Sequence, residues 1–265
     1  MTTGISIRVP QADWGSQRAW FKPPLDETLG GWEYINLFGE NESLTQNLSR
    51  GKPSGSVTGS PALLPASALF KLKANFISTQ VEQAYAMTFF AIAKTARTAE
   101  NPSIGNEFVI SNNLSNGPDG GTNGASLYFS NSGTTGMMNV TMAVTQSSSP
   151  PGTPSTGQTT QLSVPVSISD KPVIIMGSYS ASDNTLRVVA NGVAAQLALP
   201  INSPTSIQRG APPRIGSVGQ NTGSIGTTDI EIFSSALLSR KITTEEEDVM
   251  TEWGRNLLII KGVSY

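Results

Sequence analysis

The chain has 265 residues, and an all-β sandwich reaches this length as one domain. Its net charge is −2 and only 14% of its residues are charged, so nucleic acid is not favoured as a partner. It contains no cysteine and no histidine, which excludes disulfides, thiolate chemistry, His-ligated zinc and histidine-based nucleophilic catalysis. The N-terminal stretch MTTGISIRVPQADWG is not a secretory signal, and no apolar run is long enough to span a membrane, so we expect a cytoplasmic product without a membrane partner.

The N-terminal part combines one expected strand with an irregular stretch rich in aromatic residues. ISIRV (5–9) alternates apolar and polar residues, as a strand does. We predict that residues 1–60 form an N-terminal arm that packs on the core or on a neighbouring subunit. Aromatic residues are enriched at interfaces, although the same rings could stack on sugars. The interface candidates are Trp14, Trp20, Trp32 and Tyr34.

From residue 61 to the end, short strand signals alternate with turn signals, and no strand–helix alternation appears. We therefore predict a two-sheet antiparallel β-sandwich for residues 61–265. Residues 147–160 are expected to form a long hairpin tip. The predicted strands are ALFKLKANFI (68–77), MTFFAIAKTA (87–96), NEFVISN (106–112), ASLYFSN (125–131), MNVTMAVTQ (138–146), QLSVPVSI (161–168), KPVIIMGSYS (171–180), TLRVVANG (185–192), VAAQLAL (193–199), PRIGSVG (213–219) and TDIEIF (228–233).

One segment near the C-terminus, residues 239–258, predicts a helix. Thr243 or Thr244 can cap its start, and acidic residues in its first turn suit the helix dipole. Val249, Trp253 and Leu257 recur every four residues and predict one buried face.

Two C-terminal segments resemble the concanavalin A-like, laminin-G-like jelly-roll family, in the versions found in bacteriophage tail and other virion proteins. Residues 171–199 resemble a hairpin pair of that family, with Asn191 and Gly192 as its tight turn. Residues 225–257 resemble its closing strand, a corner and a helix ending in Trp-Gly. The matching positions are Phe233, Ala236, Leu237, Ser239, Glu246, Trp253 and Gly254. The resemblance implies two curved antiparallel sheets, but no activity, because lectins, glucanases and adhesion modules share this fold.

A pair of carboxylates, Asp229 and Glu231, falls on one face of a predicted strand, as in a glycoside hydrolase. The glucanases of the resembled family carry a third acid three residues further on, where this chain has Ser234. Ile230 and Ile232 alternate with the acids, which is typical of a strand with one solvated face. We therefore expect no enzyme. The consecutive acids at 245–248 do not converge on a helix, so capping is preferred to a metal site.

The Gly-rich loop NNLSNGPDGGTNG (112–124) supplies several oxygen ligands. An ordinary turn explains it first, and a sugar or calcium contact second, since calcium takes carbonyl and carboxylate oxygens. Only one of its residues is charged, so any calcium would bind weakly, and no other cofactor is expected. The carbohydrate-binding candidates are Asn113, Asn116, Asp119, Asn123 and Tyr128. No catalytic residue and no metal ligand is assigned.

The function expected from this resemblance is a non-enzymatic structural protein of a tailed bacteriophage virion, tail- or fibre-associated, whose lectin-like domain contacts host-surface glycans. A head decoration protein and a stand-alone carbohydrate-binding module are the alternatives, and the missing third acid argues against a glycoside hydrolase or lyase. Expected partners are further copies of the chain, with a trimer favoured because fibre proteins are usually trimers, and other virion proteins. The chain would assemble in the host cytoplasm and reside in the virion.

Overall fold

The computed structural model describes residues 29–72, 74–113, 115–119, 122–146, 156–168, 170–199, 207–218 and 229–265. The chain divides into two units, Met1–Gly30 and Gly31–Tyr265, and the β-sandwich belongs to the second. Trp14, Trp20, the strand predicted at 5–9 and most of the hairpin tip lie outside the described residues. Within the described part, no helix is both long and apolar enough to cross a membrane.

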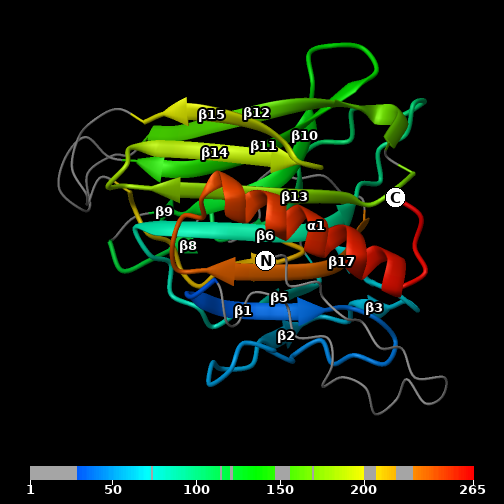
Figure 1. Cartoon of the computed structure of the whole chain (residues 1–265), viewed down its shortest axis with the longest axis horizontal. Helices are drawn as coiled ribbons and strands as arrows, with labels where there is room; N and C mark the ends of the chain where they lie inside the picture. The colour runs from blue at the N-terminus through cyan, green and yellow to red at the C-terminus, as the bar shows by residue number, and fades with distance from the viewer. Residues whose placement is uncertain are drawn as a thin grey trace, which may run out of the picture. The chain divides into compact units, whose positions relative to one another are not determined.

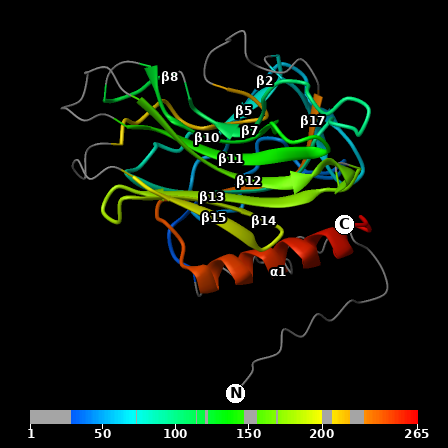
Figure 2. The same cartoon turned by 90° about the horizontal axis from the view of Figure 1, so that it is seen from above.

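Within the described residues, two antiparallel sheets form a sandwich with one α-helix, α1 (Thr244–Ile260), on the outer face of one of them (Figures 1 and 2). Sheet A consists of β15 (Val193–Ala198), β14 (Thr185–Ala190), β13 (Val173–Ser180), β6 (Ala86–Lys94), β17 (Asp229–Leu238), β4 (Ala68–Lys71) and β3 (Ala62–Leu63) in this order, with β1 (Trp32–Leu37) also paired to β17. Sheet B consists of β12 (Thr156–Pro165), β11 (Met137–Gln146), β10 (Ala125–Asn131), β7 (Glu107–Ser111), β16 (Arg214–Ile215), β5 (Phe76–Ser78) and β2 (Ser56–Thr58). A separate ladder joins β8 (Ser115–Asn116) to β9 (Thr122–Asn123), and a 3-10 turn, Val166–Ile168, follows β12.

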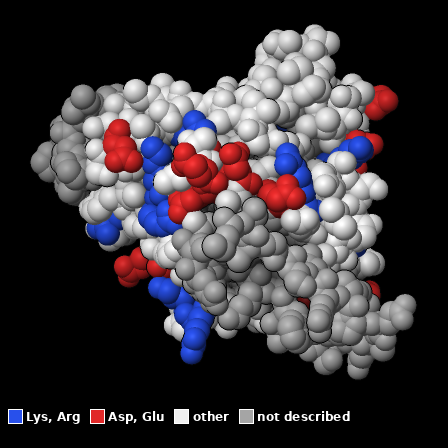
Figure 3. Space-filling view, viewed as in Figure 1, with Lys and Arg blue, Asp and Glu red and all other residues white. Residues whose placement is uncertain are grey.

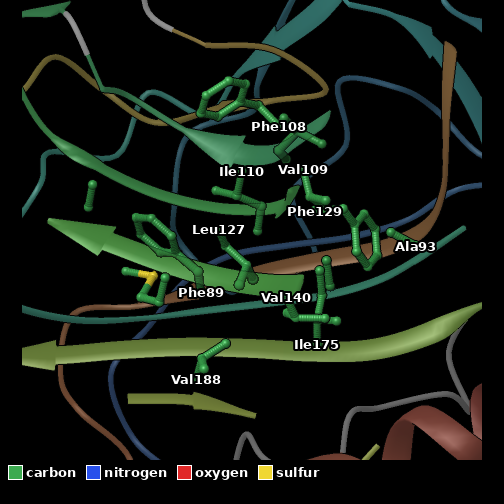
Figure 4. Packing of buried hydrophobic residues seen from close by; sticks show 14 of the residues in the cluster. Phe89, Ala93, Phe108, Val109, Ile110, Leu127, Phe129, Val140, Ile175 and Val188 are labelled. Carbon is green, nitrogen blue, oxygen red and sulfur yellow. The ribbon is translucent and has the colours of Figure 1, made fainter. Parts of the chain in front are cut away.

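The core lies between the two sheets and is built from alternate residues of each strand. Figure 4 shows side chains of both sheets in this core, among them Phe129 and Val140 of sheet B and Phe89 and Ile175 of sheet A. The sheets approach closely over Gly177, where a Cβ atom would lie 2.4 Å from the sulfur of Met142. The alternation in the sequence therefore predicts which face of these strands is buried.

Helix α1 begins where the sequence predicts, at a capping box. Thr243 is the N-cap, its hydroxyl accepts from the Glu246 backbone N–H at 3.3 Å, and the Glu246 carboxylate accepts from the Thr243 N–H at 2.8 Å. The prediction of its buried face is partly wrong, because Val249 is 44% exposed. The buried stripe passes instead through Met250, Trp253, Gly254, Leu257 and Leu258.

Three boundaries differ from the sequence prediction. The expected strand 68–77 is divided into β4 and β5, which belong to different sheets. The sandwich begins before residue 61, because β1 pairs with β17 and β2 pairs with β5. The expected corner, marked by Phe233, Ala236 and Leu237, is part of β17, since β1 extends the pairing of that strand to Leu238.

Candidate functional site

Three loops of the sandwich meet in one cluster of polar and aromatic residues. They are residues 79–85 between β5 and β6, residues 112–124 between β7 and β10, and residues 207–213 before β16. We call the group formed by Gln83, Tyr85, Asn112, Asp119 and Arg209 the Arg209 cluster. Its members come from all three loops, so only the folded chain brings them together.

An ion pair between Asp119 and Arg209 forms the centre of this cluster. Arg209 Nη2 lies 2.7 Å from Asp119 Oδ1, and Nε lies 3.0 Å from Oδ2. The backbone N–H of Arg209 donates to Oδ2 at 2.9 Å. Burial of Asp119 opposes its ionisation, but the hydrogen bonds and charge of Arg209 outweigh that cost and hold the pKa of this carboxyl below its usual value. The pair therefore remains charged at neutral pH and fixes the guanidinium.

Arg209 presents one side of its guanidinium to a tyrosine and keeps unused hydrogen-bonding capacity. The guanidinium carbon lies 4.5 Å from the centre of the Tyr85 ring, which is a cation–π distance. The Arg209 side chain is 26% exposed, whereas that of Asp119 is 5% exposed. Nη1 of Arg209 has no hydrogen-bond partner among the described residues. A ligand that approaches the loops can thus accept from a guanidinium that is already held in place.

Two buried amide side chains, Gln83 and Asn112, connect the three loops by hydrogen bonds. The Gln83 side-chain oxygen accepts from Asn112 Nδ2 and from the Gly210 backbone N–H, both at 2.7 Å. Asn112 Oδ1 in turn accepts from the Ala125 N–H at 2.7 Å. Gly117 packs so tightly that a Cβ atom there would lie 2.0 Å from the Arg209 carbonyl oxygen. Close packing therefore accounts for glycine at this position of the loop.

Of the five carbohydrate-binding candidates from the sequence, only Asp119 lies in the Arg209 cluster. Asn113 follows β7, is half-buried, and its backbone N–H donates to the Ser111 hydroxyl at 3.1 Å. The backbones of Asn116 and Asn123 belong to the β8–β9 ladder, and their side chains lie outside the described residues.

Calcium does not fit the loop as described. Both carboxylate oxygens of Asp119, the only acid in the loop, accept hydrogen bonds from Arg209. No group of three carboxylates that could hold a metal occurs in the described part of the chain. Calcium needs several oxygen ligands with free lone pairs, so this donor set disfavours it.

Tyr128 lies elsewhere, on the outer face of sheet B. Its ring stacks on Phe108 of the neighbouring strand, with centroids 4.9 Å apart and an interplanar angle of 28°. The Ser130 and Thr141 hydroxyls, 2.8 Å apart, lie on the same face. In Figure 4, the Phe108 ring points away from the group around Phe89. Burial raises the pKa of Tyr128, so its hydroxyl stays protonated and available as a donor.

The structure corrects the interface role of two aromatic residues. Trp32 and Tyr34 lie on β1 and are buried, and Tyr34 is wholly enclosed as part of the core cluster. Its hydroxyl accepts from Asn36 Nδ2 at 3.2 Å. A ring enclosed by its own chain offers no surface to a neighbouring subunit.

The two carboxylates on β17 sit as an ordinary strand face would place them. Asp229 is exposed and pairs across the sheet with Lys71, and Glu231 lies opposite Lys94 and accepts from the Ser67 hydroxyl at 2.6 Å. Ser234 is buried and donates to the Asn36 carbonyl at 3.1 Å. This position, where the glucanases of the resembled family carry their third acid, therefore serves the β1–β17 pairing.

A second group of charged residues lines a cleft at the start of α1. A cleft of about 320 Å³ lies between this helix and the β14–β15 hairpin, and its lining includes Asp183, Arg187, Gln196, Lys241 and Glu247. Figure 3 shows acidic side chains gathered over α1 with basic side chains beside them. Arg187 makes two bonds to Glu247, at 2.6 and 2.7 Å, and Lys241 donates to Thr185 at 2.7 Å. The charged side chains of the cleft are therefore used in contacts between the helix and the hairpin, and the cleft is not preferred as a ligand site.

Sequence reasoning missed Arg209, Tyr85 and Gln83. Arg209 is 90 residues from Asp119 along the chain, and no local pattern links them. Its neighbours, SIQRGAPPR, indicate only a turn. A lone arginine before Gly-Ala-Pro-Pro carries no signal of a site until the fold places it beside the loop.

No protein-family model and no curated protein matches the sequence. Solved structures resemble the chain. A botulinum neurotoxin type C structure, described by its cell entry through interaction with two ganglioside molecules, gives a TM-score of 0.58 at 9% identity and covers 86% of this chain and 51% of that one. The binding domain of botulinum neurotoxin DC in complex with SialylT gives 0.57 at 8% identity, covering 84% and 51%. The botulinum neurotoxin serotype D binding domain gives 0.57 at 10% identity, covering 85% and 51%.

These identities show a shared fold. The chain is a two-sheet antiparallel jelly-roll β-sandwich with one C-terminal helix, which confirms the fold class predicted from the sequence. It spans about half of the length of the solved structures that it resembles.

Proposed function

We propose that this domain binds carbohydrate without catalysis and that the Arg209 cluster contacts the sugar. The observation that carries the proposal is the partly exposed Arg209 guanidinium, held by Asp119 against Tyr85, with Nη1 left unbonded in the described chain. A pre-positioned planar donor beside an aromatic ring can bind sugar hydroxyls and carboxylates directionally. The resembling structures described with gangliosides and with SialylT support carbohydrate as the ligand class.

Within the described residues, Tyr128 and Phe108 form another aromatic pair, on the outer face of sheet B. Because Phe108 is only 6% exposed, its ring offers little surface to a sugar. The Arg209 cluster is therefore the preferred contact.

Replacing Arg209 by lysine is expected to weaken glycan binding about tenfold, because lysine keeps the charge but loses the planar fork. A glycan array, with and without calcium, would identify the ligand, and titration calorimetry would measure its affinity. Arg214→Lys is the matched control, since that guanidinium also stacks on a ring, 4.3 Å from the centre of Phe76, but lies outside the cluster. Equal affinities of the two variants would remove Arg209 from the site. An array without any binder would reject carbohydrate as the ligand.

The setting that we propose for this activity is a bacteriophage virion, with the protein on the tail or a fibre. The support is the resemblance of residues 171–199 and 225–257 to jelly rolls of virion proteins. Mass spectrometry of purified particles is expected to detect the chain in several copies per virion. Separated tails should carry it, whereas its recovery with heads would favour a decoration protein. A chain absent from particles would leave the stand-alone carbohydrate-binding module.

A further inference from the structure

In the part of the chain that the structure describes, strand β15 forms an edge of sheet A without the usual protection against pairing. Among the described residues it pairs only with β14, and Figure 1 shows it at the margin of the sheet. Its sequence, VAAQLA, contains no charged residue and no proline. Native edge strands are normally blocked by charges, proline, bulges or a covering segment. Val193 is 61% exposed, and Ala194, Gln196 and Ala198 are exposed as well.

The hairpin turn determines which backbone groups of β15 face outward. Asn191 and Gly192 both have positive φ, 49° and 88°, as a two-residue hairpin turn requires. The residues that flank such a turn, Ala190 and Val193, form a hydrogen-bonded pair, and hydrogen-bonded and non-bonded pairs then alternate. It follows that every second residue from Ala194 directs its N–H and C=O to the open edge. These residues are Ala194, Gln196 and Ala198.

We propose that β15 pairs in antiparallel fashion with β15 of a second copy of this chain, about a two-fold axis at Gln196. In this register Ala194 lies opposite the partner subunit's Ala198, and Gln196 lies opposite the partner subunit's Gln196. Each of the three opposing pairs exchanges two backbone hydrogen bonds. The methyl side chains of alanine allow close approach, and two glutamine amides can donate to each other across the axis.

Self-pairing also suits the inner face of the strand. Ala195 and Leu197 are partly buried and pack against the core. In the proposed register, Leu197 lies beside the partner subunit's Ala195, so the apolar row continues from one sandwich into the next. β15 itself is uncharged, and the charges in the cleft beside Gln196 are paired with each other, Arg187 with Glu247 and Lys241 with Asp183. Two copies therefore meet without repulsion, whereas a charged peptide would find no unpaired opposite charge along the strand. The observations therefore favour a second copy as the occupant.

Helix α1 holds the edge in place before association. Arg187 on β14 binds Glu247 of the helix through two hydrogen bonds. Gly192 of the turn lies near Thr251, to which a Cβ atom would come within 3.7 Å. At the other end, the Leu199 N–H donates to the Asn184 carbonyl at 2.7 Å. A strand ordered in advance loses little entropy on pairing, which favours association. Its two-fold symmetry predicts a dimer, in place of the trimer that the virion resemblance suggests.

The test is sedimentation equilibrium on the full chain, in which the wild type is expected to form a dimer. Gln196→Glu places two carboxylates opposite each other and is expected to raise the dimer dissociation constant about tenfold or more at neutral pH. Acidification, which protonates these carboxyls, should restore the dimer. Within a subunit the substitution is tolerated, because residue 196 lies opposite Arg187.

Gln161→Glu is the matched control, because Gln161 is exposed on β12, the edge strand of sheet B. It should leave the dimer intact. Hydrogen exchange adds a residue-level readout: the amides of Ala194, Gln196 and Ala198 should be protected in the wild type and exchange faster in Gln196→Glu. A wild type that is monomeric at high micromolar concentration, a trimer, or a dimer that Gln196→Glu does not weaken would each overturn the proposal. This outcome is independent of glycan binding.

Discussion

Replacing Arg97 by methionine is expected to lower the free energy of unfolding by about 3–5 kcal/mol, the cost of leaving one partner of a buried ion pair alone. The side chains of Arg97 and Glu107 are both fully buried and paired with each other. Arg97 also donates to the Gly105 carbonyl and, at 3.1 Å, to Asn131 Oδ1. Glu107 accepts from the Ala96 N–H at 2.8 Å.

The location of this pair explains the size of the effect. Arg97 follows β6 of sheet A, and Glu107 begins β7 of sheet B, so the pair joins the two sheets. Burial raises the pKa of Glu107 and lowers that of Arg97, and the opposite charge of each acts against this shift. Each charge is thus stabilised chiefly by the other.

Chemical denaturation measured at neutral pH checks the prediction. Lys52→Met is the control for loss of an ion pair, because Lys52 and Glu33 are 37% and 21% exposed and their pair should contribute less than about 1 kcal/mol. The double variant Arg97→Met with Glu107→Gln should be more stable than Arg97→Met alone, since no unpaired charge remains. If Arg97→Met lost no more stability than Lys52→Met, the Arg97–Glu107 ion pair would not contribute to holding the two sheets together.

The second large effect is expected at Trp253, where alanine should lower the free energy of unfolding by about 3–5 kcal/mol. This ring is 3% exposed and lies 5.1 Å from the Phe90 ring on the outer face of sheet A. Next to it, Gly254 brings the helix against Ile174, to which a Cβ atom would approach within 3.0 Å. Truncation would leave a cavity that the close-packed helix cannot fill.

Val249→Ala on the same helix is the control, with an expected change within about 0.5 kcal/mol because this side chain is exposed. Thermal and denaturant unfolding of both variants would show the difference. If Val249→Ala lowered the free energy of unfolding as much as Trp253→Ala does, α1 would pack on its Val249 face, as the spacing of residues 249, 253 and 257 suggests. Unequal losses in the expected order support the stripe through Met250 and Leu258.

The strand positions could be predicted because their signal is local. Alternating side chains mark β10 and β11 almost to the residue, and Asn191-Gly192 marks the β14–β15 turn. The same local signal gave a wrong prediction, one continuous strand, at residues 68–77. Apolar and polar residues alternate from β4 to β5, so the pattern does not reveal the turn between them that crosses from sheet A to sheet B. It also missed β1, whose sequence WEYINL lies among turn residues and does not alternate.

The candidate site was only half predictable. Asn and Gly in the loop 112–124 indicated oxygen ligands, and Asp119 is indeed part of the cluster that the loops form. Its partners come from other loops: Tyr85 precedes β6, and Arg209 precedes β16. Spacing along the chain carries no information about such contacts, and the pairing also removes the calcium that the loop composition had suggested.

The sequence by itself determined the fold class, since strand periodicity, turn residues and a capped C-terminal helix each depend on neighbouring residues. It also excluded histidine and cysteine chemistry by composition. Only the tertiary structure decided that Tyr34 is core, that Ser234 serves a strand pairing, that Arg209 meets Asp119, and that β15 ends its sheet. Each of these depends on contacts between residues far apart in the chain, which form when two sheets pack and which no local pattern encodes.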